Sequence, residues 1–360
     1  MIQKIFFSFS GLIIMMFLLT SCSASAKISA EKSIDEIMTR YNNATAPGAS
    51  VLIMKEDKII FEKGYGVRNI NTQEKITPTA NFRLASVTKQ FTAMSILLLA
   101  KNKKLSIEDP LTKYFSSFPN YGKNIKIKDL LTHSSGLIDY EDLMPSNQTI
   151  QLHDTNCLQL MYNTNKLYFP AGTDYKYSNT GYAILALIVE QVSGQDFAQF
   201  LKDNIFKPLG MKTTVAYEEG KSTVTNRVYG HSYEAGKWSL TDQSLTSAVL
   251  GDGGIYTNVE ELSKWITALW SFKLLPKEMQ ERTWTRTTFK NGKTIDYGFG
   301  WHIEDFEGVT HPFHDGSSIG FRNSIAVFPE QKLMVVVLSN QNDHDPIEEV
   351  HNIAKLYLKK

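Results

Sequence analysis

The chain has 360 residues, of which 42% are hydrophobic and 21% charged, a composition typical of a folded globular protein rather than a disordered one. Its 38 Lys and Arg residues balance 37 Asp and Glu residues, so it lacks the basic excess of nucleic-acid-binding proteins. Two cysteines cannot form a disulfide framework. We therefore expect a neutral protein with a sizeable core and no nucleic-acid partner.

The first 22 residues have the layout of an export signal. Lys4 precedes an apolar run from Gly11 to Leu19, and the segment ends in Leu19-Thr20-Ser21-Cys22. This ending resembles a bacterial lipobox, in which the cysteine is acylated after cleavage. We predict a signal peptide over residues 1–21, lipidation of Cys22, and a location in the cell envelope with the lipid as the membrane contact.

The next segment, residues 22–45, is predicted to form the anchor tether and an N-terminal amphipathic helix. Apolar residues recur there at helical spacing: Ile34, Ile37, Met38 and Tyr41. Two strand-like stretches follow, residues 50–54 and 58–61, with Glu56-Asp57 as the turn of a hairpin. Once Cys22 is acylated, Cys157 is the remaining thiol, and we expect it to be a small core residue.

The rest of the chain alternates between helical and strand patterns. Residues 86–101 are apolar almost all round, which predicts a buried helix. A helical insert is predicted over about 103–250, followed by strands at 323–328 and 332–339 and a closing helix at 347–358. Strands at both ends with helices between them predict an α/β (α+β) fold, in which one sheet is assembled from the two termini.

Ser86-Val87-Thr88-Lys89 opens the predicted buried helix. A hydroxyl at that position lies at the positive end of the helix dipole, and Lys89 lies one turn later on the same side. An activated serine needs a nearby base, and a desolvated lysine amine can serve as one. The alternative interpretation is a helix N-cap with a solvated lysine, but the apolar surroundings favour a buried amine.

Tyr177-Ser178-Asn179 precedes a second predicted helix, from about Thr180 to Val192. If this triplet is extended, Tyr177 and Asn179 point to one side. The phenol can pass a proton, and the amide can hydrogen-bond to a carbonyl group. The alternative is that Asn179 or Thr180 only caps the helix.

His314-Asp315-Gly316, followed by Ser317, precedes the C-terminal strand pair. Taken alone, His314 fits a surface or core histidine as well as a functional one. The order and spacing of the three motifs are more specific than any one of them. Together they resemble the serine β-lactamase and penicillin-binding-protein superfamily, and most closely its branch of class C β-lactamases, DD-peptidases and esterases. Three further stretches resemble sequences of the same superfamily: residues 82–92, 129–137 and 251–258.

The resemblance covers about residues 46–345 as a hydrolase domain and implies a β-lactamase/transpeptidase-like fold. Its antiparallel sheet would be flanked by N- and C-terminal helices, the latter within 346–360, and accompanied by an all-helical subdomain. By similarity, Ser86 would be the acylated nucleophile, and Lys89 and Tyr177 would share the work of the base. No metal or organic cofactor is implied.

The resemblance also implies a substrate-binding set: Asn179, His314, Gly316 and Ser317. The N–H groups of Ser86 and Ser317 would form the oxyanion hole. A lysinium beside the phenol would lower the pKa of Tyr177, and desolvation would lower that of Lys89. His314 would carry only partial positive charge. Asp315, if it faced the site as an anion, would repel a substrate carboxylate.

Three competing interpretations remain open. Gly316-Ser317-Ser318-Ile319-Gly320 matches the nucleophile elbow of α/β-hydrolases, although the residues after it read as a strand. The segments 311–314 and 343–345 contain histidines and aspartates that could bind a metal for hydrolysis. The third is a penicillin-binding sensor that is acylated without turnover.

We predict a serine hydrolase that acts through a Ser86 acyl-enzyme on an amide or ester: a D-amino-acid peptide (cell-wall-derived peptides included), a β-lactam or a simple ester.

Overall fold

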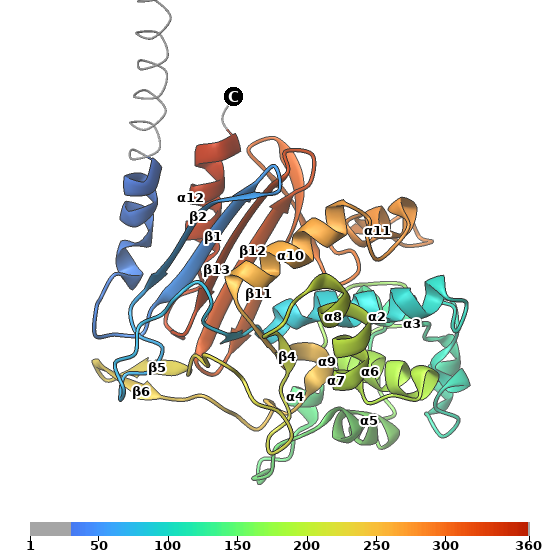
Figure 1. Cartoon of the computed structure of the whole chain (residues 1–360). Helices are drawn as coiled ribbons and strands as arrows, with labels where there is room; N and C mark the ends of the chain where they lie inside the picture. Colours follow the sequence, from blue (N-terminus) through green and yellow to red (C-terminus); the bar gives the residue numbers. More distant parts are fainter. Residues whose placement is uncertain (1–29, 359–360) are drawn as a thin grey trace, which may run out of the picture.

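The computed structural model describes residues 30–358, and its centre is a six-stranded antiparallel sheet in the order β10-β11-β12-β13-β1-β2 (Figure 1). The strands are β1 (Ala49–Lys55), β2 (Lys58–Tyr65), β10 (His302–Phe306), β11 (Val309–Ser318), β12 (Phe321–Phe328) and β13 (Leu333–Ser339). β1 and β13 are neighbours, with Ala49 opposite Ser339. The sheet therefore joins the two ends of the chain, as the sequence predicts.

Two helical segments cover one face of this sheet (Figure 1). They are the N-terminal helix over residues 30–37, which continues as η1 (Met38–Tyr41), and α12 (Ile347–Leu358). Strand residues alternate between the faces, so Val335 and Val337 pack under these helices while Val336 and Leu338 join the core on the other side. The continuous apolar run of β13 follows from this burial on both faces.

The other face carries the larger core. α10 (Val259–Trp270) packs on β1 and β13, and α2 (Lys89–Lys101) lies against α10, where the ring of Phe91 stacks on Trp265 at 4.2 Å. α2 is preceded by η2 (Ala85–Thr88), one turn of 3₁₀ helix that contains Ser86. The predicted buried helix is confirmed, and Ser86 lies in this tighter first turn.

A helical lobe packs beyond α2 (Figure 1). Its helices are η3 (Leu111–Lys113), η4 (Asn120–Asn124), α3 (Ile127–Leu131), α4 (Tyr140–Leu143), α5 (Asp154–Tyr162), α6 (Asn179–Ser193), α7 (Phe197–Leu201), η5 (Lys202–Phe206), α8 (Lys207–Leu209) and α9 (Leu250–Gly253). α11 (Lys277–Thr283) follows α10. Cys157 is buried in this lobe, the core position expected for it.

Short strands complete the fold. They are β3 (Phe82–Arg83), β4 (Val215–Ala216) and β7 (Ile255–Thr257) in one small sheet, and the hairpins β5 (His231–Glu234) with β6 (Lys237–Leu240) and β8 (Thr287–Thr288) with β9 (Thr294–Ile295). Within residues 30–358, no helix has the length and apolar character needed to cross a bilayer. The predicted signal peptide and Cys22 lie outside the described residues.

Candidate active site

Ser86 and Lys89 lie at the junction of η2 and α2. Lys89 is fully buried and Ser86 is partly exposed, so the hydroxyl can be reached from solvent while the amine cannot. The Nζ atom of Lys89 is 3.0 Å from Ser86 Oγ. Ala85, the residue before the serine, has a φ of +48°, a left-handed conformation that is unfavourable for a residue with a Cβ. The chain is thus held in a strained turn at the hydroxyl, as is common at functional sites.

Two carbonyl oxygens fix the orientation of the Lys89 amine. Nζ donates to Asn179 Oδ1 at 2.8 Å and to the main-chain oxygen of Asp252 at 3.0 Å. These oxygens can only accept, so each takes one N–H, and the remaining position of the amine faces Ser86 Oγ. When Lys89 is neutral, its lone pair points at the serine hydroxyl.

Burial lowers the pKa of Lys89 to about 8, against the opposing influence of three carboxylates: Asp252, Asp139 and Glu141. The neutral amine is therefore accessible near neutral pH, as expected for a general base. Asp252 is itself buried, which raises its pKa to about 6, and its carboxylate accepts a 2.8 Å hydrogen bond from Tyr140 Oη. This buried carboxylate is a charge partner of Lys89.

Asn179 is held by contacts on both sides. Its Oδ1 accepts from Lys89, and its Nδ2 donates to Glu141 Oε1 at 3.2 Å. Its main-chain N–H donates to Asp139 Oδ2 at 2.6 Å. Asn179 is the first residue of α6, and the N-cap position belongs to Ser178, which makes no side-chain cap. The structure therefore gives Asn179 contacts that a helix cap alone would not have.

Tyr177 lies beside Lys89 in the same site. Its ring faces the Lys89 ammonium at 4.9 Å and stacks on His133 at 4.1 Å. Its hydroxyl is buried and has no hydrogen-bond partner of normal geometry among the described residues. Burial raises the pKa of Tyr177, and a contact with Ser86 offsets this only in part. The expectation of a lowered phenol pKa was wrong because desolvation outweighs the nearby cation.

His314 lies on β11 and is fully buried. Its Nδ1 is 2.6 Å from the carbonyl of Asp315 and its Nε2 is 3.0 Å from Tyr297 Oη. A carbonyl cannot donate, so Nδ1 holds the proton and Nε2 accepts from the phenol. Burial lowers the pKa of His314 well below its usual value, so the imidazole is neutral. The expected partial positive charge is therefore absent.

Gly316 explains how closely β11 approaches the turn that holds Ser86. A Cβ at this position would lie 2.1 Å from the carbonyl oxygen of Leu84, so only glycine allows this contact. Ser317 is exposed beside it. Neighbouring side chains of a strand point to alternate faces, so Asp315 points away from the face that carries His314 and does not face the site. Its cross-strand partner is Ser324. Its expected repulsion of a substrate carboxylate does not arise.

The structure does not support the elbow interpretation. Ser318 ends β11 and the next strand, β12, begins at Phe321, so a strand-to-helix turn is absent here. The two histidines of segment 311–314 are also separated, because positions three apart in a strand face opposite sides. His311 packs near Phe328 on the far face, while His314 faces Tyr297.

Several residues of the site carried no predicted role. His133 accepts the N–H of Ser178 at 3.1 Å and supports the ring of Tyr177. Asn323 donates through Nδ2 to the carbonyls of Arg83 and Leu84 at 2.9 and 3.1 Å, which ties β12 to the turn before Ser86. His133 and Asp252 fall within the stretches 129–137 and 251–258, which resemble the superfamily. This resemblance was the one feature of the sequence that pointed to them.

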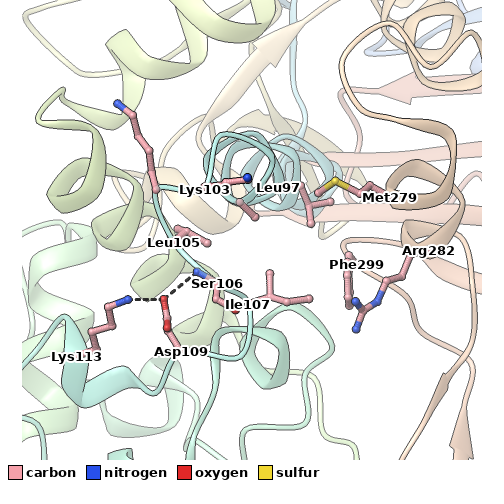
Figure 2. Close-up of a pocket in the computed structure, with 12 residues that line it drawn as sticks. Leu97, Lys103, Leu105, Ser106, Ile107, Asp109, Lys113, Met279, Arg282 and Phe299 are labelled. Atoms are coloured by element: carbon pink, nitrogen blue, oxygen red, sulfur yellow. Dashed lines mark hydrogen bonds and ion pairs between the residues drawn. The ribbon is translucent and has the colours of Figure 1, made fainter.

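A cavity of about 480 Å³ lies away from this centre, against the helical lobe (Figure 2). Its wall includes Leu97, Ile107, Met279 and Phe299, with Arg282 and Lys113 at its edge. Ser86, Lys89 and Tyr177 do not line it. The predicted catalytic residues are therefore separate from this cavity.

A partly exposed serine beside a buried lysine, at the start of a helix packed on an antiparallel sheet, defines the β-lactamase/transpeptidase-like class of proteins. Residues 31–358 match the family model described as Beta-lactamase, and the chain belongs to this family. Both the fold class and the superfamily predicted from the sequence are confirmed.

Three proteins illustrate the similarity. Penicillin-binding protein 4* of Bacillus subtilis is 29% identical over 83% of this chain and 69% of its own length. The octameric penicillin-binding protein homologue of Pyrococcus abyssi has a TM-score of 0.78 at 26% identity, covering 92% of this chain and 77% of the other. The D-amino acid amidase of Ochrobactrum anthropi shares the fold, with a TM-score of 0.77 at 20% identity over 91% and 98%. The chain spans about two thirds of its curated relatives, 69% in the first case and 63% in another.

Proposed function

We propose that this protein is a serine hydrolase that cleaves an amide or ester through an acyl-enzyme at Ser86. The observation that carries the proposal is the Lys89 amine, held by two carbonyl oxygens so that its third position faces Ser86 Oγ at 3.0 Å. Family membership supports the same chemistry.

In the proposed first step, neutral Lys89 takes the proton of Ser86, and Oγ attacks the substrate carbonyl carbon. The N–H groups of Ser86 and Ser317 would hold the oxyanion, since Gly316 lets β11 approach the nucleophile turn. The raised pKa of Tyr177 keeps its phenol protonated, so it can pass a proton to the leaving group, with Lys89 restoring that proton. Water then releases the acyl group by the reverse proton path.

The charges around the site favour one substrate class. Glu141 and Asp139 flank Asn179, and His314 is neutral. A substrate with a carboxylate beside the scissile bond therefore gains no cationic partner from His314 and meets two acidic groups. We propose amides and esters without such a carboxylate, such as D-amino-acid amides. The similarity in fold to a D-amino acid amidase is compatible with this class.

The decisive test is intact-mass measurement after exposure to a β-lactam, a p-nitrophenyl ester and a fluorophosphonate. Wild-type protein should gain one acyl or phosphonyl group, and Ser86→Ala should lose both labelling and turnover. Ser318→Ala is the matched control and should keep both. Turnover that persists in Ser86→Ala, or is lost in Ser318→Ala, would contradict the proposal.

The second candidate, a penicillin-binding sensor, uses the same acylation step without deacylation. It is favoured by similarity to proteins named for penicillin binding. A stoichiometric β-lactam adduct that outlasts hours, with no product release from any ester, would support it over the hydrolase.

The location in the cell envelope also remains a proposal. Cleavage after Ser21 and acylation of Cys22 would anchor the chain by lipid alone. Membrane fractionation of the wild type and of Cys22→Ser tests this. The wild type should sediment with membranes, while the variant should appear in the soluble fraction.

A further inference from the structure

A second cluster of reactive side chains lies on the sheet face opposite Ser86. It consists of Glu304 on β10, His311 on β11 and His351 on α12. One ligand atom from each, a carboxylate oxygen or a ring nitrogen, lies within 4.8 Å of the other two. One hairpin, β10–β11, and the C-terminal helix α12 therefore bring two imidazoles and a carboxylate to one point.

Register and packing fix this arrangement. Glu304 and His311 are direct cross-strand partners, so their side chains project from the same face. The ring of His351 stacks on Phe306 at 4.3 Å and 13°, and the ring of His311 packs on Phe328 at 4.3 Å. The aromatic neighbours hold both imidazoles in place but offer them no hydrogen-bond acceptor.

The hydrogen bonds leave both imidazoles with a free nitrogen. His311 is 0% exposed, and its Nδ1 lies 3.3 Å from the carbonyl of Pro312, so Nδ1 carries the proton and Nε2 has a lone pair. Nε2 of His311 and Nε2 of His351 are both buried and without a hydrogen-bond partner among residues 30–358. A buried polar atom without a partner is costly, and a metal ion would satisfy both at once.

We propose that Glu304, His311 and His351 bind one first-row divalent transition-metal ion, with Zn²⁺ as its representative. Two imidazole nitrogens and one carboxylate oxygen form a common zinc ligand set, with bonds of about 2.0–2.2 Å and a fourth position for water. Ligand atoms on one such ion lie roughly 3.4 Å apart, so the cluster must contract by on the order of 1 Å.

Access and chemistry fit this ion. The side chains of Glu304 and His351 are 34% and 16% exposed, so the cluster opens to solvent on one side. The ligand set lacks the many oxygens that Ca²⁺ or Mg²⁺ requires.

The bound ion would join α12 to the edge hairpin β10–β11. Lys355 on α12 already forms an ion pair with Glu307 in the turn of the same hairpin. The ion would thus add a second link between the C-terminal helix and the sheet edge. Its role would be structural, because the sheet separates it from Ser86.

The test uses the full-length protein stripped with a chelator and titrated with ZnCl₂ alone, with binding followed by competition against a chromogenic chelator. Wild type should bind one equivalent, and its thermal midpoint should rise by a few degrees at saturating Zn²⁺. Glu304→Gln and His351→Gln should each weaken binding by roughly 100-fold or more and abolish the thermal shift. Both replaced side chains are partly exposed, so the variants should still fold, as circular dichroism would verify.

His344→Gln is the matched control, because His344 also pairs with a glutamate, Glu349, at this end of the molecule. It should bind Zn²⁺ like the wild type. Absence of saturable binding in the wild type, or equal binding in His351→Gln, would overturn the proposal. Labelling of Ser86 by a fluorophosphonate should be the same with and without Zn²⁺, so this result stands independently of the proposed hydrolase.

Discussion

The side-chain oxygen of Asn179 and the amine of Lys89, 90 positions apart in the chain, lie 2.8 Å apart. This oxygen and the main-chain oxygen of Asp252 accept hydrogen bonds from two of the amine's protons. The third position of the amine therefore faces Ser86. The direction of the lysine lone pair, and not only its distance from Ser86, is therefore set by the first residue of α6.

The first prediction concerns this amide. Asn179→Asp keeps an oxygen for Lys89 but places a negative charge beside the amine, which raises the pKa of Lys89. The acid limb of the kcat/KM–pH profile should move to higher pH by about one unit or more. Asn179→Ala should instead lower kcat by about 100-fold, because the amine loses its orientation. An unshifted profile in Asn179→Asp would show that Lys89 does not set the limb.

The second prediction is the pH dependence of the wild type. Lys89 must be neutral to accept a proton, and its pKa is about 8. The logarithm of kcat/KM should therefore rise with unit slope below about pH 8 and level off above it. Stopped-flow acylation with a p-nitrophenyl ester measures this limb directly. A rate that falls across the same range would contradict Lys89 as the base.

The third prediction uses the buried carboxylate. Ionised Asp252 raises the pKa of Lys89, so Asp252→Asn should lower that pKa and move the acid limb to lower pH by about one unit. The asparagine oxygen can still accept from Tyr140, and the main-chain bond to Lys89 is kept. Shifts in opposite directions for Asp252→Asn and Asn179→Asp, from the same assay, would assign the limb to Lys89.

The fourth prediction concerns the approach of β11 to the nucleophile turn. A Cβ in Gly316→Ala would lie 2.1 Å from the oxygen of Leu84, so the strand must move away from Ser86. We expect kcat/KM to fall by about 100-fold or more. Gly253→Ala is the control, since its Cβ would lie 3.5 Å from Ala85, an ordinary contact. Thermal unfolding of both variants separates misplacement from loss of folding.

The fifth prediction concerns substrate charge. D-Phenylalanine amide and D-phenylalanyl-D-alanine differ in the carboxylate beside the scissile bond. Because His314 is neutral and Glu141 is nearby, the amide should have the higher kcat/KM, by about tenfold or more. Glu141→Gln should narrow this difference at low salt. A preference for the dipeptide would disprove the proposed substrate class.

Local patterns predicted the elements that depend on neighbouring residues. The hairpin at Glu56-Asp57, the buried helix after Ser86 and the closing helix at 347–358 all follow from side-chain periodicity and turn residues. The pairing of Ser86 with Lys89 was predictable too, because one helical turn separates them.

Contacts between distant segments were not predictable in the same way. Asp252 lies 163 positions after Lys89, and its effect on the amine depends on how α9 packs against η2 and α2. The charge of His314 could not be predicted from its residue type, because its burial beside Tyr297 keeps the imidazole neutral. The sequence suggested metal ligands in the segments 311–314 and 343–345, whereas the cluster in the structure combines His311 with side chains on β10 and α12.

The pairing of Ala49 with Ser339 has a consequence for how the molecule is made. A nascent chain cannot complete its central layer until the ribosome has finished nearly all of it, because β1 must wait for β13 across roughly 290 residues. Asn323, which fastens the turn before Ser86, also belongs to this late portion. Ser86 is thus translated early, but the turn that holds it acquires its fixed geometry only when the last strands are in place.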